Sequence, residues 1–191
     1  MEAIETKRIG KYKIEVVQDE YAESPDAWGN EDAFVVYDHR QFDVRREGFD
    51  PREIFDHTNE KGVMMYKNYF VFVLYAYIHS GVVLSVGSHN FPDARWDVST
   101  TGFVLVKKDK DTDTEEKALK IAESVTEEWN QYLSGDVYGY KVTSADDDFD
   151  DVIHSCWGFY GDPEYCMTEG VAEAEGCIEN DKHGQLELEI K

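Results

Sequence analysis

Segment 68–78 (NYFVFVLYAYI) constrains the fold more than any other part of this chain. Ten of its eleven residues are apolar or aromatic, and β-branched and aromatic types predominate. A strand with apolar side chains on both faces is stable only when both faces are covered, so the segment predicts a central, buried strand. It is well short of the roughly 18 apolar residues that cross a bilayer, so it indicates a globular core and no membrane association.

Shorter segments of similar composition predict the other strands of the same sheet. His79-Ser80-Gly81 separates the central segment from the next apolar run, which predicts a hairpin with Gly81 at a positive φ. Segment 186–190 (LELEI) alternates like a half-buried edge strand. The remaining predicted strands are 12–17, 33–38, 82–86, 102–108, 137–143 and 152–160.

One long helix is predicted after Asp113. Asp113 is placed to cap it, with Glu116 completing a capping box, and Ser134-Gly135 ends it. A second helix is predicted from Pro163 to about Glu175. The apolar face of the long helix recurs every three or four residues; its members are Leu119, Ala122, Val125, Trp129 and Tyr132. The sum predicts an α+β fold: a mainly antiparallel sheet with one long helix packed on a face.

The distribution of charge indicates how the chain is divided, and the net charge argues against some binding functions. The chain has 41 acidic and 19 basic residues, a formal net charge of -22, and residues 151–191 hold ten acids and two bases. We therefore expect one domain over 1–161 and an acidic C-terminal extension over 162–191. The 12 Tyr, 10 Phe and 4 Trp argue against a disordered acidic chain. Direct binding of nucleic acid or anionic lipid needs a basic face, which this composition does not favour.

The N-terminus shows no apolar core after its charges, and three cysteines do not suit a disulfide framework. A reducing, cytoplasmic location is therefore expected. No cofactor and no metal are predicted. Asp109, Asp111 and Asp113 begin like a calcium loop, but Thr114 and Lys120 stand where that loop needs Gly and Glu. His154 and Cys156 are the candidate metal ligands, because residues two apart on a strand share a face.

Catalysis is the second hypothesis. The candidate residues are His79 at the predicted hairpin, His89 and Asp97 in the loop after segment 82–86, and Cys156. Loops on a rigid sheet are where catalytic residues gather. The hypothesis is a small hydrolase or a metal-dependent enzyme, and it requires these side chains to converge in one pocket. Because no nucleophile elbow, phosphate loop or dinucleotide turn is present, the sequence favours a non-enzymatic role.

Several motifs together resemble a family of small proteins encoded by bacteriophages and prophages. This family has no established activity, so the resemblance implies an accessory protein acting on host machinery and supplies no mechanism. The segment after Tyr37 departs from the family, whose members are richer in Arg there. The resemblance covers most of residues 12–161; its motifs are QDEYAESPDAW (18–28), YDHRQFD (37–43), IHSG (78–81), WNQYLSGDVYGY (129–140) and SCWGFYG (155–161).

The leading hypothesis combines the phage setting with the charge. It is a non-enzymatic acidic accessory protein that binds a basic surface of a host nucleic-acid-handling or defence protein, with carboxylates standing in for the phosphates of DNA. Such mimicry requires acids gathered on one ridge, since B-DNA carries a charge about every 1.7 Å. A third hypothesis is a virion structural or assembly protein that pairs through LELEI. The candidate partner-binding acids are Asp109, Asp111, Asp113, Glu116, Glu123, Glu127, Asp146, Asp147, Asp148, Asp150 and Asp151.

Overall fold

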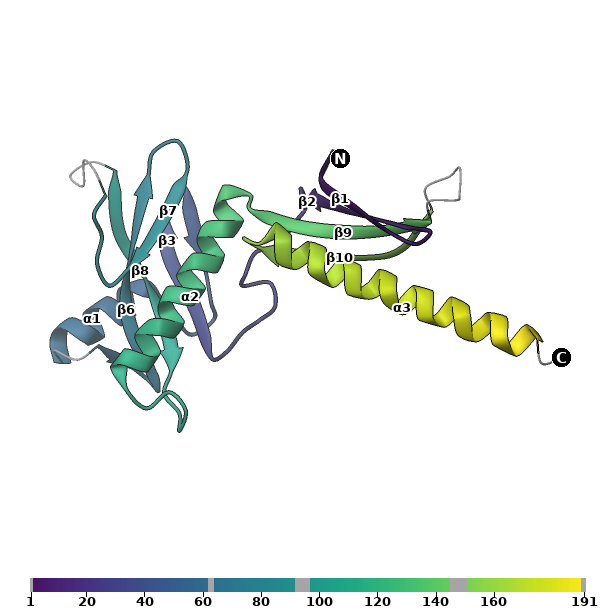
Figure 1. Ribbon diagram of the computed structural model, residues 1–191. Coiled ribbons are helices and arrows are strands. Elements are labelled where there is room, and N and C mark those ends of the chain that lie inside the picture. The colour runs from purple at the N-terminus through teal and green to yellow at the C-terminus, as the bar shows by residue number, and fades with distance from the viewer. Residues whose placement is uncertain (1, 62–63, 92–96, 145–150, 190–191) are drawn as a thin grey trace. The chain divides into compact units, whose positions relative to one another are not determined.

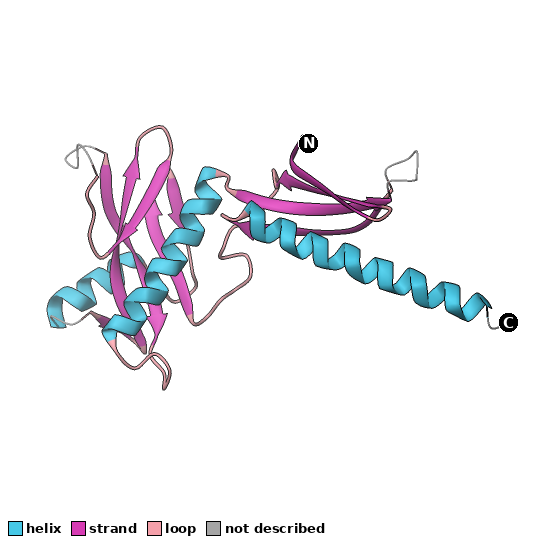
Figure 2. Cartoon of the chain, in the orientation of Figure 1, coloured by secondary structure: helices cyan, strands magenta, loops and turns pink. Residues whose placement is uncertain are grey.

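The computed structural model describes residues 2–61, 64–91, 97–144 and 151–189, and the polypeptide forms two compact units. Unit 1 comprises Met1–Glu23 and Gly135–Lys191, and unit 2 comprises Ser24–Ser134. Both ends of the chain therefore build unit 1, and the middle builds unit 2. Each unit is an antiparallel sheet with helical cover, as Figures 1 and 2 show, which confirms the predicted α+β class.

Unit 2 contains the central strand predicted from segment 68–78. That strand, β6, pairs with β8 on one side and with β5 and β7 on the other, in the order β4-β3-β8-β6-β5. All of these pairings are antiparallel. The elements of unit 2 are β3 (Ala33–His39), β4 (Phe42–Val44), α1 (Pro51–Lys61), β5 (Met65–Tyr66), β6 (Tyr69–Ile78), β7 (Val82–Val86), β8 (Val98–Lys107) and α2 (Glu115–Ser134).

Helices cover the two faces of this sheet. Leu74 of β6 lies on the face that packs against Trp129 of α2. Val71, three residues earlier on β6, lies on the opposite face with Ile54 of α1. Side chains alternate along a strand, so the continuous apolar character of β6 follows from having a helix on each side.

Unit 1 is a four-stranded sheet in the order β1-β2-β9-β10, with one helix on a face. Its elements are β1 (Ala3–Ile9), β2 (Tyr12–Gln18), β9 (Val137–Ser144), β10 (Val152–Tyr160) and α3 (Pro163–Glu189). The helix lies close to the sheet at Gly170, where an added Cβ would be 2.7 Å from Ile14 Cγ2 and 3.1 Å from Tyr140 Cγ. This close approach requires glycine at position 170.

The helix cap predicted at Asp113 is wrong. Helix α2 begins at Glu115, and Thr114 caps it: its hydroxyl accepts from the Lys117 N–H at 3.4 Å, and its carbonyl accepts from the Ala118 N–H at 3.1 Å. Asp113 instead forms an ion pair with Lys117 at 2.8 Å. Both Asp and Thr are good caps, and the lysine four residues on draws the carboxylate away. The predicted end is confirmed, with Gly135 at φ 79°.

Two further expectations fail. The hairpin between β6 and β7 is present, but Gly81 is not among the glycines with positive φ. Segment 186–189 continues helix α3 and forms no edge strand, and residue 190 lies outside the described residues. Leu and Glu are good helix formers, and extending an existing helix is easier than starting a strand.

The sequence analysis predicts none of the four shorter or charged elements β1, β4, β5 and α1. No helix in the described part of the chain is long and apolar enough to span a membrane.

Candidate metal centre

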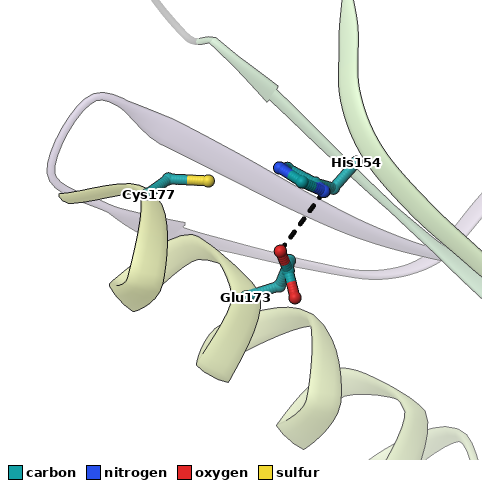
Figure 3. A group of neighbouring side chains, drawn as sticks. All are labelled: His154, Glu173 and Cys177. Carbon is teal, nitrogen blue, oxygen red and sulfur yellow. Dashed lines mark ion pairs between the residues drawn. The ribbon is translucent and has the colours of Figure 1, made fainter. Parts of the chain in front are cut away.

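His154, Glu173 and Cys177 form the densest group of metal-ligating side chains that the structure describes (Figure 3). His154 lies on β10, and Glu173 and Cys177 lie on α3. Residues four apart on a helix project from the same face, so the carboxylate and the thiol point together. Helix α3 packs against β10, which brings the imidazole to both of them.

The ligand atoms of these three residues all lie within 4.8 Å of one another. His154 Nδ1 is 3.2 Å from Glu173 Oε1, an ion pair when the histidine is protonated. The two side chains are 46% and 42% exposed, so an ion has access from solvent. Burial raises the pKa of the Cys177 thiol, and the carboxylates of Glu173 and Asp181 raise it further.

Asp181 fixes the next turn of α3. Its Oδ2 atom accepts a hydrogen bond from the Tyr12 hydroxyl at 2.8 Å and lies 2.6 Å from Lys11 Nζ. These two donors, Lys11 first, lower the pKa of Asp181. The hairpin between β1 and β2 therefore contacts the helix one turn beyond Cys177.

The donor set suits zinc. Imidazole nitrogen, carboxylate oxygen and thiolate sulfur are all zinc ligands, whereas calcium and magnesium prefer oxygen alone. Zinc–ligand distances of 2.0–2.3 Å place tetrahedral ligand atoms about 3.5 Å apart. The group needs to contract by about 1 Å at its widest separation, which rotation of the glutamate or cysteine side chain can supply. Three protein ligands leave a fourth position open.

Cys156, the other predicted metal ligand, is outside this group. It lies on β10 two residues after His154 and is exposed, with its Sγ atom 4.0 Å from the Trp157 carbonyl oxygen. The nearby Cys166 is buried, and burial raises the pKa of its thiol to about 12. Of the predicted pair, the structure therefore brings only His154 to the centre.

The predicted catalytic histidines lie in a row of aromatic rings in unit 2. His89 and Phe91 are stacked with centroids 5.3 Å apart, Phe91 and Tyr77 are stacked at 5.5 Å, and His79 lies 6.3 Å from Tyr77. The two histidines are thus separated by two rings. They share neither a hydrogen bond nor an ion pair among the described contacts.

Asp97 is the third of these catalytic candidates. It contacts β6 through its backbone, where its carbonyl oxygen accepts from the Ile78 N–H at 2.8 Å. Cys156 belongs to unit 1 and lies on β10. Among the described residues, no hydrogen bond or ion pair joins Asp97 to either histidine, which is the kind of contact that a hydrolase would require.

The predicted partner-binding acids are interspersed with lysines. Glu116, Glu123 and Glu127 are exposed on one stripe of α2, as expected. Lys120 lies four residues after Glu116 and three before Glu123, so it falls in the same stripe. Asp113 is paired with Lys117. Lys120 therefore interrupts the acidic stripe of α2.

Asp109 and Asp111 form a local turn before α2. Asp109 Oδ1 accepts from the backbone N–H groups of Asp111 at 2.8 Å and of Thr112 at 2.7 Å. These bonds, that of Thr112 first, lower the pKa of Asp109. Asp151 is exposed immediately before β10. The remaining candidates, Asp146, Asp147, Asp148 and Asp150, lie outside the described residues.

Glu173 and Cys177 were not predicted as metal ligands. Their spacing of four is a usable signal only when the helix is known to extend past Cys177, and the predicted helix ended near Glu175. Comparison with known proteins adds no further guide: no family model, characterised protein or solved structure matches the chain significantly.

Proposed function

We propose that this protein binds a zinc ion through His154, Glu173 and Cys177. The observation that carries the proposal is the convergence of three different zinc-ligand types from a strand and a helix. A bound ion would join β10 to α3 in place of the His154–Glu173 ion pair. The fourth position would hold water or a side chain of a partner.

The proposal predicts that zinc competes with protons. Cys177 must lose its proton to bind the ion, and its raised pKa makes that loss more costly. His154 must also be neutral. Zinc affinity should therefore rise with pH, and a proton should be released from Cys177 on binding.

A zinc titration against a chromophoric chelator tests the proposal. We expect one zinc per chain for the wild type. His154→Ala and Cys177→Ser should each weaken binding by more than about tenfold, because even indirect partners of a ligand typically account for 10- to 100-fold. Cys156→Ser is the matched control, a thiol on the strand that carries His154 but outside the group, and it should bind zinc like the wild type.

Circular dichroism of each variant verifies that it is folded. Absence of zinc binding by the folded wild type would overturn the proposal. So would unchanged affinity in both His154→Ala and Cys177→Ser, because the ion would then be held elsewhere.

A second candidate function is the binding of a basic protein surface, the role expected for a phage accessory protein. The observation that favours it is the charge of α3. Between Pro163 and Lys182 the helix has six carboxylates and one lysine. Glu164, Glu175 and Glu179 are exposed and recur on its outer stripe. The six carboxylates are Glu164, Glu169, Glu173, Glu175, Glu179 and Asp181.

This candidate makes α3, and not α2, the contact surface. Neutralising Glu164, Glu175 and Glu179 to Gln should abolish salt-sensitive retention of basic nucleic-acid-binding proteins from a host lysate. Neutralising Glu116, Glu123 and Glu127 on α2 is the matched control and should have less effect. Retention that high salt does not weaken would contradict an electrostatic contact, since exposed charges are screened within about 8 Å at physiological ionic strength.

A further inference from the structure

Strand β10 is an open edge of the unit 1 sheet; between two bulges, at Val152–His154 and Trp157–Phe159, it pairs regularly with β9 from His154 to Trp157. The sheet order is β1-β2-β9-β10, so β10 pairs with β9 alone within the described residues. It is nine residues long and exposed from Val152 to Trp157. Its large side chains include Val152 at 52%, Ile153 at 44% and Trp157 at 38% exposure. An exposed apolar edge of this length is a template for pairing with another strand.

The other sheet edges of the described chain are protected by charged side chains or by shortness, and β10 has neither of these. The opposite edge of the same sheet, β1, carries Glu5, Lys7 and Arg8. In unit 2, β4 is three residues long and β5 is two. Charged side chains and short strands are the usual means of preventing edge-to-edge pairing.

Strand β7 is protected in a different way. The Asn130 side chain of α2 accepts from the Leu84 N–H at 2.8 Å and donates to the Leu84 carbonyl oxygen at 3.1 Å. The amide therefore occupies backbone groups that another strand would need. On the exposed part of β10, from Val152 to Trp157, the side-chain contact described with a backbone group is a weak one, from Cys156 Sγ to the Trp157 carbonyl oxygen at 4.0 Å.

The absence of charged residues on β10 favours a second copy of this chain as its partner. The sequence VIHSCWGFY contains no Asp, Glu, Lys or Arg, in a chain of net charge -22. Two copies of so acidic a chain repel each other over most of their surface. A strand without formal charge is where a second copy can approach. Antiparallel pairing about a twofold axis is self-complementary, because each strand supplies the donors and acceptors that the other needs.

We propose that β10 pairs with β10 of a second copy of this chain, joining two four-stranded sheets into one sheet of eight strands. The contact is limited to one strand per copy, which is small for a stable interface. The dimer should therefore form at micromolar or higher concentration. The proposal is independent of zinc, since it rests on the backbone edge and not on the His154 side chain.

The pairing predicts an unusual salt dependence. Salt screens repulsion between the two acidic copies but does not weaken backbone hydrogen bonds or apolar contact. Dimerisation should strengthen as salt is raised. This is opposite to the behaviour expected for binding to a basic partner, so the two associations are distinguishable.

Sedimentation velocity and light scattering over micromolar to near-millimolar concentrations test the proposal, in the presence of a metal chelator. The wild type should approach twice the 22.0 kDa mass of one chain. Ile153→Glu places two like charges at the paired edges and should raise the dissociation constant at least about tenfold. Ile4→Glu is the matched control, an exposed isoleucine (54%) on the opposite edge strand, and it should dimerise like the wild type.

A wild type that stays monomeric throughout this range, at low and at high salt, would overturn the proposal. An equal loss of dimer in Ile4→Glu and Ile153→Glu would also overturn it, because the association would then not depend on β10. Unchanged dimerisation in Ile153→Glu would place the contact elsewhere and reject the proposal as well.

Discussion

The Tyr12 hydroxyl donates a hydrogen bond of 2.8 Å to Asp181 Oδ2, across 169 positions of sequence. Lys11 Nζ reaches the same oxygen at 2.6 Å. The bond joins the second strand of the chain to its last helix, and so ties together the two segments of unit 1. It also holds the helical turn that follows Cys177.

This contact makes the stability of unit 1 sensitive to acid. The pKa of Asp181 is lowered in the folded protein, chiefly by Lys11 and Tyr12. A carboxylate with a lowered pKa stabilises the fold above its unfolded pKa of about 3.9, and that contribution is lost as the pH falls further. Asp181→Asn should lower the melting temperature at pH 7 and have progressively less effect below pH 4. An effect that grows as the pH falls would contradict this assignment.

The assignment of Thr114 as the N-terminal cap of α2 can be tested by substitution. Thr114→Ala removes the hydroxyl that accepts from the Lys117 N–H and should cost about 1 kcal/mol. Asp113→Ala removes only an exposed ion pair and should cost less. Urea unfolding of both variants gives the comparison. The reverse order would restore Asp113 as the cap, as the sequence alone suggested.

The sequence predicted the elements whose signals are local. The apolar run of β6 and the three-to-four spacing of α2 are readable within one window of sequence. The pairing of β2 with β9 could not be predicted, because the paired residues lie more than a hundred positions apart and no local sequence pattern specifies which strands pair. Strand β1 was missed because its charged side chains, which protect an edge, hide the strand pattern.

The candidate site was predicted in part. His154 was identified from the face it shares on a strand. Cys177 was not, because the predicted helix stopped before it. The acidic stripe of α2 was located correctly, but the sequence argument considered its glutamates and overlooked Lys120, which shares their face. In both cases the missing information concerned a helix: how far α3 extends, and which residues share the exposed face of α2.

Asn130 is predicted to be important for unit 2. Its side chain satisfies both the N–H and the carbonyl of Leu84 on β7. Asn130→Leu leaves two partly buried backbone groups without that partner and should cost about 1–3 kcal/mol. Gln131→Leu is a matched control, since the Gln131 side chain makes a 3.5 Å contact with Glu127 on the surface. Equal losses in the two variants, measured by urea unfolding, would contradict the role of Asn130.

Two glycines of α3 should respond to alanine in opposite directions. An added Cβ at Gly170 would lie 2.7 Å from Ile14 Cγ2, so Gly170→Ala must push the helix away from the sheet and should cost about 1–3 kcal/mol. At Gly176 nothing lies within 4 Å of that position, so Gly176→Ala should gain about 0.5–1 kcal/mol of helix stability. Thermal unfolding of both variants measures the difference. Because the substitution and the helix are the same, helix propensity cannot explain opposite signs; equal effects would mean that α3 does not pack on β2 at Gly170.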